Sequence, residues 1–508
     1  MADMIHSAED YHRATEYDRH TLGGHPLDWE NQPSVYKVYE GVEPVPLPEV
    51  GGLDQQDLWQ LSGLKEAGIS RSDFSIEKLA GVLELTNCLT AKVRYPGQDF
   101  YYRSAASAGA LYPNEIYLAA HDVSDLEPGL YHHNLMKRQL VPLRRQNVKS
   151  FTAKAAGFSE KDDLAATFFI TGIFFRSAWK YRKRAYRYVL LDAGHLLENL
   201  ILSLKHFRFP FLFHYDFNDL MVSDLIGIDI RQEACLAYVN VYAGQSKEVR
   251  EMEKELLPLP NEVVEASRVS GKEMVYPEIE ETHWGGIDPS SHPETESGFE
   301  KSVGISSRIW KEITQGRKKS SGPGYPEVLF RRRSRRNFVK RAMQGEDLET
   351  LLDLICSSYS RHEEKRLCSA SLQIGFLVND ISGFQPGFHL LDPLNRKTGL
   401  VETGRLTGSA AAACLNQEWL ENAAVHFLFM ANLNFIDRKW GIRGYRYAMM
   451  TAGRLGQILY LGAASLQIGC CGIGAYYDDE IRKILGLDRN SALLYLVAAG
   501  PVKSLIPE

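Results

Sequence analysis

The residues best suited to chemistry fall in four short segments. The first segment is a run of small residues that ends in a proline turn and consists of Ser107, Ala108, Gly109, Ala110, Leu111, Tyr112, Pro113 and Asn114. Small side chains let the backbone approach a flat ligand, while Ser107 and Asn114 add hydrogen-bonding groups. A tight structural turn ahead of an apolar strand would have the same composition. The segment is therefore either a ligand-binding loop or a turn.

The second segment is strongly basic, because residues 330–338 contain five arginines and a serine. In an extended backbone, Arg332, Ser334 and Arg336 alternate onto one face, where forked donors and a hydroxyl suit a phosphate. A solvated basic surface or a nucleic-acid patch would use the same residue types. The whole chain has 58 Lys and Arg against 64 Asp and Glu, a net charge of -6, which makes nucleic-acid binding the weaker interpretation.

The third and fourth segments are shorter. Gly472, Ile473 and Gly474 belong to a glycine-rich stretch in which the backbone could contact a ligand or simply connect a helix to a strand. Lys180 and Tyr181 place an amine beside a phenol, a pair that could handle protons but is more often an ordinary surface feature. No segment has the spacing of a metal site, and the common dinucleotide, P-loop, zinc-protease and serine-hydrolase motifs are absent from the sequence.

Composition predicts a globular protein of two to four domains in a reducing compartment. The chain has 508 residues, of which 44% are hydrophobic and 24% charged, and its seven cysteines include no Cys-x-x-Cys. The acidic, histidine-containing amino terminus does not resemble a secretory signal, and the most apolar stretches, 166–175 and 423–430, are too short for membrane helices. We expect a cytoplasmic protein in which both stretches are buried strands.

An internal repeat sets the predicted architecture. Residues 184–207 align with residues 443–466 at a constant offset of 259, with nine identities in 24 positions. Both copies carry the apolar spacing of a helix buried along one face, and each is followed by an apolar strand. We therefore predict an α+β fold with an extended arm at 1–70, one domain at 71–245, a polar linker at 246–324 and a second domain at 325–508. Two such copies could form a pseudo-twofold dimer within one chain.

Taken together, the four segments resemble the nitroreductase superfamily of FMN proteins, and specifically its SagB/ThcOx-type azoline oxidases. The resemblance lies in SAGALYPNEIY and KYRKRAYRYVLLDAGHLLENL of the first copy, and in RRSRRNF and GIGAYYDDEIRKILGLD of the second. It implies that Arg332, Ser334 and Arg336 contact the FMN phosphate and ribityl chain, and that Gly472, Ile473 and Gly474 lie beside the flavin ring. It further implies that Ser107, Ala108, Gly109 and Ala110 line the ring from the other copy, and that Lys180 and Tyr181 handle the proton.

The copies differ in these motifs. The second copy has residues 366–373 where the first has its SAGALYPNE loop, and the first copy has no RRS-x-R segment. We therefore expect one FMN per chain, held between the loop of the first copy and the arginines of the second.

The resemblance implies oxidation of thiazoline or oxazoline rings in a modified peptide, with hydride transfer to flavin N5 and a cyclodehydratase as a possible partner. Two alternatives remain open, an NAD(P)H-dependent reductase of nitro or conjugated groups and a non-catalytic scaffold that binds flavin or peptide.

Overall fold

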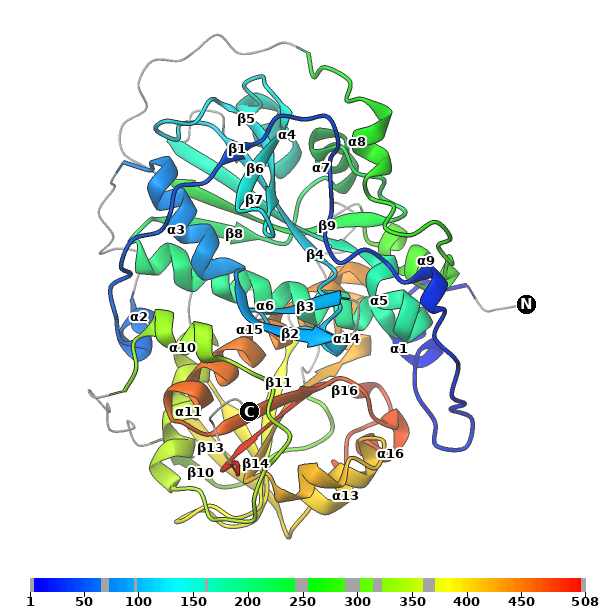
Figure 1. The fold of residues 1–508 in the computed structure, drawn as a ribbon. Helices are drawn as coiled ribbons and strands as arrows, with labels where there is room; N and C mark the ends of the chain where they lie inside the picture. Colours follow the sequence, from blue (N-terminus) through cyan, green and yellow to red (C-terminus); the bar gives the residue numbers. More distant parts are fainter. Residues whose placement is uncertain are drawn as a thin grey trace. The chain divides into compact units, whose positions relative to one another are not determined.

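The computed structural model describes residues 4–64, 73–95, 98–159, 163–242, 255–287, 302–313, 322–359 and 371–503 (Figure 1). The chain divides into two compact units. The C-terminal unit comprises Met1–His25, Asp54–Gly63 and His292–Glu508, and the N-terminal unit comprises Pro26–Leu53 and Leu64–Ser291. Parts of the predicted arm and linker, residues 65–70, 246–254, 288–301 and 314–321, lie outside the described residues.

The described residues of the N-terminal unit form a seven-stranded antiparallel sheet. Its strands, in spatial order, are β1 (Val45–Pro46), β6 (Gln139–Arg144), β5 (Gly129–Asn134), β4 (Asn114–Ala120), β7 (Leu164–Ile173), β9 (Glu233–Tyr242) and β8 (Phe211–His214). Every residue of β4 and β7 is buried, as expected for central strands with both faces covered. The apolar stretch at 166–175 thus forms most of a buried strand, as its sequence predicts.

Helices cover both faces of this sheet (Figure 1). They are α3 (Ile76–Thr86), α4 (Lys149–Ala156), α5 (Phe174–Tyr181), α6 (Ala185–His206) and α7 (Asp219–Ile226). Tyr117, Ala119 and Phe169 alternate onto the face that packs against α4 and α7. On the opposite face, α6 runs so close to β7 that a Cβ on Gly172 would collide with Val189. A hairpin of β2 (Leu89–Tyr95) and β3 (Gln98–Arg103) precedes the loop at 104–113.

The C-terminal unit repeats this plan, so the two tandem α+β domains are confirmed. Its described strands have the equivalent order β10 (Trp310–Glu312), β13 (Lys397–Thr403), β12 (Gly387–Asp392), β11 (Gln373–Val378), β14 (Val425–Asn432), β16 (Ser491–Gly500) and β15 (Gly469–Ile473). Its helices include α10 (Tyr325–Arg331), α11 (Gly345–Tyr359), α13 (Thr407–Ala413), α14 (Leu433–Trp440), α15 (Gly444–Ser465) and α16 (Asp478–Ile484). The first residues of α6 and α15, Ala185 and Gly444, are separated by the offset of the sequence repeat.

The repeat extends into the arm and the linker. Val45 of β1 pairs with Leu140, and Lys311 of β10 pairs with Thr398, which is the repeat equivalent of Leu140. Strand β10, in the predicted linker, is therefore the counterpart of β1, in the predicted arm. Each seven-stranded sheet receives one edge strand from the segment that precedes its own domain.

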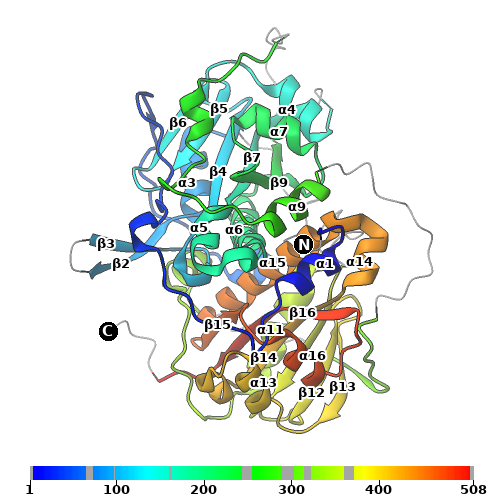
Figure 2. The same ribbon diagram turned by 90° about the vertical axis from the view of Figure 1, so that its right-hand side faces the viewer.

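A second pair of contacts relates the arm to the linker. The Nδ1 atom of His12, on α1 (Ala8–Ala14), lies 3.0 Å from the hydroxyl oxygen of Tyr445 within the C-terminal unit. The Nδ1 atom of His283, on α9 (Pro277–Gly285), lies 3.2 Å from the hydroxyl oxygen of Tyr186 within the N-terminal unit. Tyr186 and Tyr445 are equivalent positions of the repeat. Figure 2 shows α1 beside α14, and each unit thus binds a helix from the segment that precedes the other domain.

None of the helices in the described ranges is both long enough and apolar enough to cross a membrane.

Candidate active site

The SAGALYP loop in the N-terminal unit has an unusual backbone. It connects β3 to β4, and Gly109, Ala110 and Tyr112 have φ angles of +64°, +54° and +47°. Residues other than glycine rarely adopt positive φ, so the loop is conformationally strained at Ala110 and Tyr112. Such a conformation persists only where the surrounding structure holds it in place.

Gly109 lies directly against the predicted Lys-Tyr pair. A Cβ on Gly109 would stand 2.7 Å from the hydroxyl oxygen of Tyr181 and 3.1 Å from Nζ of Lys180. Both residues belong to the last turn of α5 and are half-buried. The Tyr181 ring packs on that of Tyr188 at a centroid distance of 4.4 Å, and Nζ of Lys180 lies 5.5 Å from the Tyr181 centroid. The structure thus brings together two segments that are far apart in sequence.

Asp192 holds the loop, and the sequence interpretation did not identify it. The Ser107 hydroxyl donates a hydrogen bond of 2.6 Å to Asp192 Oδ2, and the amide of Ala108 donates one of 3.1 Å to Oδ1. Asp192 stands on α6 and is buried, which raises its pKa to about 7, although the bonds from Ser107 and Ala108 oppose the increase. The sequence signals for Asp192 were its place in the motif KYRKRAYRYVLLDAGHLLENL and its acidic side chain in a predicted apolar helix.

Asn114 and the residue after it support the sheet. The Asn114 amide donates hydrogen bonds to the carbonyl oxygens of Thr171, at 3.0 Å, and Val189, at 3.4 Å. Glu115 pairs with Arg176 at 2.5 Å and contacts His132 at 2.9 Å. Burial acts to raise the pKa of the carboxyl group, but Arg176 and the hydrogen bond with His132 outweigh it and lower that pKa. In this structure, therefore, the Asn114 amide N–H groups are directed to main-chain carbonyls.

In the C-terminal unit, the predicted phosphate-binding residues meet at Tyr460. The hydroxyl groups of Ser334 and Tyr460 are hydrogen-bonded at 2.9 Å, and the amide of Gly472 donates a bond of 2.7 Å to the Tyr460 hydroxyl. The buried guanidinium of Arg332 lies 5.4 Å from the Tyr460 ring centroid. Tyr460 thus joins the arginine segment to β15, although its position in the sequence pattern marked it only as part of an apolar stripe.

The remaining residues of this group differ in exposure. Arg336 is exposed and lies 5.9 Å from the Trp419 ring centroid, whereas Ile473 is buried on β15. A side chain on Gly472 would collide with Tyr495, so glycine is required there for packing. Gly474 follows the strand and is half-buried.

The adjacent cysteines are poor candidates for thiolate chemistry. Burial raises the pKa of both Cys470 and Cys471 above the usual thiol value, although Arg336 lowers that of Cys471 in part. Both thiols therefore stay protonated near neutral pH. In the described parts of the chain, no group of three or more His, Cys, Asp or Glu residues could hold a metal ion.

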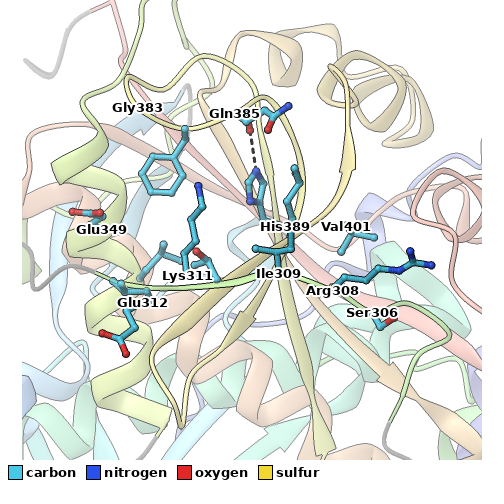
Figure 3. Close-up of a pocket in the computed structure, with 15 residues that line it drawn as sticks. Ser306, Arg308, Ile309, Lys311, Glu312, Glu349, Gly383, Gln385, His389 and Val401 are labelled. Atoms are coloured by element: carbon cyan, nitrogen blue, oxygen red, sulfur yellow. Dashed lines mark hydrogen bonds between the residues drawn. The ribbon is translucent and has the colours of Figure 1, made fainter.

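The described residues of the C-terminal unit include two large cavities. One, of about 490 Å³, is lined by Arg331, Arg333 and Arg335 together with Tyr460 and Cys470, so the arginines that alternate with the predicted set face it. The other, of about 860 Å³, lies against β10, β12 and β13 (Figure 3). In Figure 3 the side chain of Lys311 extends toward His389, whose ring is hydrogen-bonded to the Gln385 carbonyl oxygen. This second cavity contains none of the predicted site residues.

The predicted site residues therefore form two groups, one in each unit. Ser107, Gly109, Lys180 and Tyr181 come together in the N-terminal unit, and Arg332, Ser334 and Gly472 come together in the C-terminal unit. Residues 366–370, where the second copy departs from the SAGALYP sequence, lie outside the described residues.

Comparison with known proteins agrees with the repeat. The profile of the nitroreductase family matches residues 73–244 and 385–501, together more than half of the chain. A protein of Methanocaldococcus jannaschii described as a nitroreductase, MJ1384, is 30% identical over 172 residues, which cover 33% of this chain and 87% of that protein.

Two further relatives are described as processing proteins. The trifolitoxin-processing protein TfxB of Rhizobium leguminosarum bv. trifolii is 26% identical over 158 residues, 30% of this chain. The microcin B17-processing protein McbC of Escherichia coli is 28% identical over 142 residues, 26% of this chain. The matched regions span only 42% and 52% of these two relatives.

A solved structure matches nearly the whole chain. The crystal structure of a nitroreductase-like protein from Anabaena variabilis superimposes with a TM-score of 0.76 at 23% identity, covering 98% of this chain and 100% of that one. This similarity shows that the tandem fold has a counterpart of full length.

Proposed function

The chain belongs to the nitroreductase family and is an oxidoreductase, and we propose that it dehydrogenates azoline rings of a modified peptide with one bound FMN. Family membership and the resemblance to peptide-processing relatives favour this enzyme over a non-catalytic scaffold. The peptide as substrate and a cyclodehydratase as partner are parts of the proposal that rest on these relatives.

The observation that carries the proposal is the junction of Lys180 and Tyr181 with Gly109. Azoline oxidation removes a proton from one ring carbon and a hydride from its neighbour. The amine of Lys180 and the phenol of Tyr181 offer a proton acceptor. They lie beside the small residues of the loop around Gly109, whose backbone a flat ring can approach. Lys180 and Tyr181 therefore hold and move the proton in this proposal.

The residues of the C-terminal unit fit the anionic end of FMN. Arg332, Ser334 and Arg336 supply two forked cations and a hydroxyl, the donor set that a phosphate prefers. Ser334 is fixed by Tyr460, which also holds Gly472, so the predicted phosphate and ring contacts share one support. When FMN is bound, it supplies the hydride acceptor.

A second candidate is NAD(P)H-dependent reduction of a nitro or conjugated group. It is favoured by the similarity to the M. jannaschii protein, which has the highest identity of the three curated relatives described above. Under this alternative the same flavin would be reduced by a nicotinamide and would pass electrons to the substrate.

The chain offers a matched control for testing the pair. Lys439 and Trp440 are the repeat equivalents of Lys180 and Tyr181 in the second copy, and Nζ of Lys439 lies 4.8 Å from the Trp440 ring centroid.

The experiment compares Lys180→Ala/Tyr181→Phe with Lys439→Ala/Trp440→Phe in the flavin-loaded protein. A thiazoline-containing peptide serves as substrate, with oxygen as the electron acceptor. The first variant should retain flavin and lose ring oxidation, whereas the second should keep both. Wild-type turnover in the first variant would refute the assignment of the pair, and rapid flavin reduction by NADPH without any azoline oxidation would favour the reductase.

A further inference from the structure

The strained SAGALYP loop needs an external support. Ala110 and Tyr112 have positive φ angles of 54° and 47°, which are unfavourable for residues with a Cβ. The hydrogen bonds within the loop are short-range, from Ala110 N to Ser107 O and from Leu111 N to Ala108 O. They do not fix the loop relative to α5, where Lys180 and Tyr181 stand. That helix contacts the loop through the bond of 3.2 Å from Arg176 Nη1 to the Tyr112 carbonyl, which leaves Ala108 unsupported.

A single carboxylate on α6 reaches both ends of the strained stretch. Asp192 accepts hydrogen bonds from the Ser107 hydroxyl, at 2.6 Å, and from the Ala108 amide, at 3.1 Å. The Ser107 oxygen in turn accepts a bond of 2.9 Å from the amide of Tyr112. Asp192 thus fixes Ala108 directly and Tyr112 through one hydroxyl group, with Gly109 and Ala110 between them.

The second copy differs in sequence at both of these places. Thr451 is the repeat equivalent of Asp192, at the same place on α15, and residues 366–373 replace the SAGALYPNE sequence. Among the residues that the structure describes, the buried Thr451 hydroxyl has no hydrogen-bond partner. The carboxylate is thus present in the copy that has the loop and absent from the copy that lacks it.

The surroundings of Asp192 make its charge responsive to pH near neutrality. Burial raises its pKa to about 7, against the two donors that favour the ionised form. Arg103 is the charged residue that lines the small cavity beside it, with Asn87, Tyr112 and Asn114 as polar neighbours. On α6 itself, Tyr188 and His195 stand one turn away. Protonation of Asp192 would place a hydrogen on one of the two oxygens that accept bonds from Ser107 and Ala108. That oxygen would then no longer serve as an acceptor in the same way.

We infer that Asp192 is a positioning residue, which holds the SAGALYP loop so that Gly109 stays against Lys180 and Tyr181. The inference rests on the proposed function only in taking this junction as the place of reaction. The hydrogen bonds themselves do not depend on which substrate is oxidised.

Hydrogen exchange resolved to single amides tests the inference without reference to turnover. Asp192→Ala and Ser107→Ala should each accelerate exchange of the Tyr112 amide at least tenfold, and Asp192→Ala should also accelerate that of Ala108. The double variant should exchange no faster than Asp192→Ala, because both substitutions break the same chain of bonds. Glu198→Gln, which alters another buried acid on α6, should leave the loop amides unchanged.

Kinetics provide the second readout. In the wild type, kcat should rise with pH through the titration of Asp192, and this limb should disappear in Asp192→Asn while flavin content is retained. Unchanged exchange at Ala108 and Tyr112 in a folded Asp192→Ala protein would overturn the inference. If that variant does not fold, Ser107→Ala decides the question, because it removes a single hydroxyl group. Accelerated exchange together with undiminished turnover would instead count against the proposed reaction site and leave the positioning contact intact.

Discussion

The hydroxyl oxygen of Tyr181 lies 2.7 Å from the point at which a Cβ would stand on Gly109. Any side chain at position 109 must therefore displace either the loop or the Lys180–Tyr181 pair. We predict that Gly109→Ala lowers kcat/KM by about 100-fold, since a shift of about 1 Å at a reaction site can have an effect of that size. Steady-state kinetics on the flavin-loaded variant measures it.

Gly157→Ala is the matched control for this prediction. Gly157 has a φ of +75°, close to the +64° of Gly109, but nothing lies within 4 Å of a Cβ built on it. Both variants should lose about 1 kcal/mol of stability because alanine disfavours positive φ. Only Gly109→Ala should lose activity, and equal activity in the two variants would show that the contact with Tyr181 is unimportant.

A backbone difference between the copies gives a second prediction. Arg182, directly after Tyr181, has φ +50° and ψ -138°, while Gly441 at the equivalent position has φ +60° and ψ -164°. Glycine adopts this region freely, whereas arginine is strained there by about 1–3 kcal/mol. Arg182→Gly should raise the thermal midpoint by about 2–4 °C per kcal/mol of strain relieved. Thermal denaturation followed by circular dichroism measures the change, and a lower midpoint would contradict the strain argument.

The phosphate assignment can be tested by charge reversal. Arg336→Glu would set a carboxylate against the phosphate of FMN, so we expect affinity to fall by about 100-fold, or about 3 kcal/mol. The control is Arg341→Glu, an exposed arginine five residues further along the chain and outside the segment 330–338. Titration of the flavin-free protein with FMN gives both affinities. Equal affinities in the two variants would remove Arg336 from the site.

Stoichiometry tests the divergence of the two copies. The SAGALYP loop is present only in the first copy and the RRS-x-R segment only in the second. One complete set of residues should hold one flavin per chain. Denaturation releases the flavin, and its absorbance at a known protein concentration gives the ratio of flavin to protein. A ratio near two per chain would show that the second set of positions also binds flavin.

The long elements of the fold could be predicted from the sequence because their burial leaves a periodic pattern. The apolar spacing at 184–207 and 443–466 corresponds to α6 and α15, and the apolar run at 423–430 corresponds mainly to β14. Strands β1 and β10, of two and three residues, are too short to show any period. The relation between arm and linker therefore became visible only from the strand pairing of Val45 and Lys311.

Sequence-based prediction has the same limit for the individual side chains of the candidate site. Small residues and paired arginines mark their segments by composition, so Gly109 and Arg332 could be selected from the sequence. Asp192 could not, because its bond to Ser107 joins residues 85 positions apart. Tyr460 was counted as an apolar residue of a buried helix face, and periodicity does not indicate where the hydroxyl group of a buried tyrosine finds its partners.

The raised pKa of Asp192 has a consequence for stability that differs in sign from that of an ordinary surface acid. Its pKa is about 7 in the folded protein against an ordinary value of 3.8. Between these values the folded state binds one proton more than the unfolded state, so the contribution of Asp192 to stability decreases as pH rises.

We predict that the stability of wild type relative to Asp192→Asn falls by about 1.4 kcal/mol per pH unit between pH 4 and 7 and is constant above that range. Urea denaturation of both proteins at several pH values measures this difference. The control is Asp219→Asn, another buried acid, which lies on α7 of the same unit. A flat difference between wild type and Asp192→Asn over this range would show that the carboxyl group is ionised in the folded protein throughout, with its loop contacts outweighing the cost of burial.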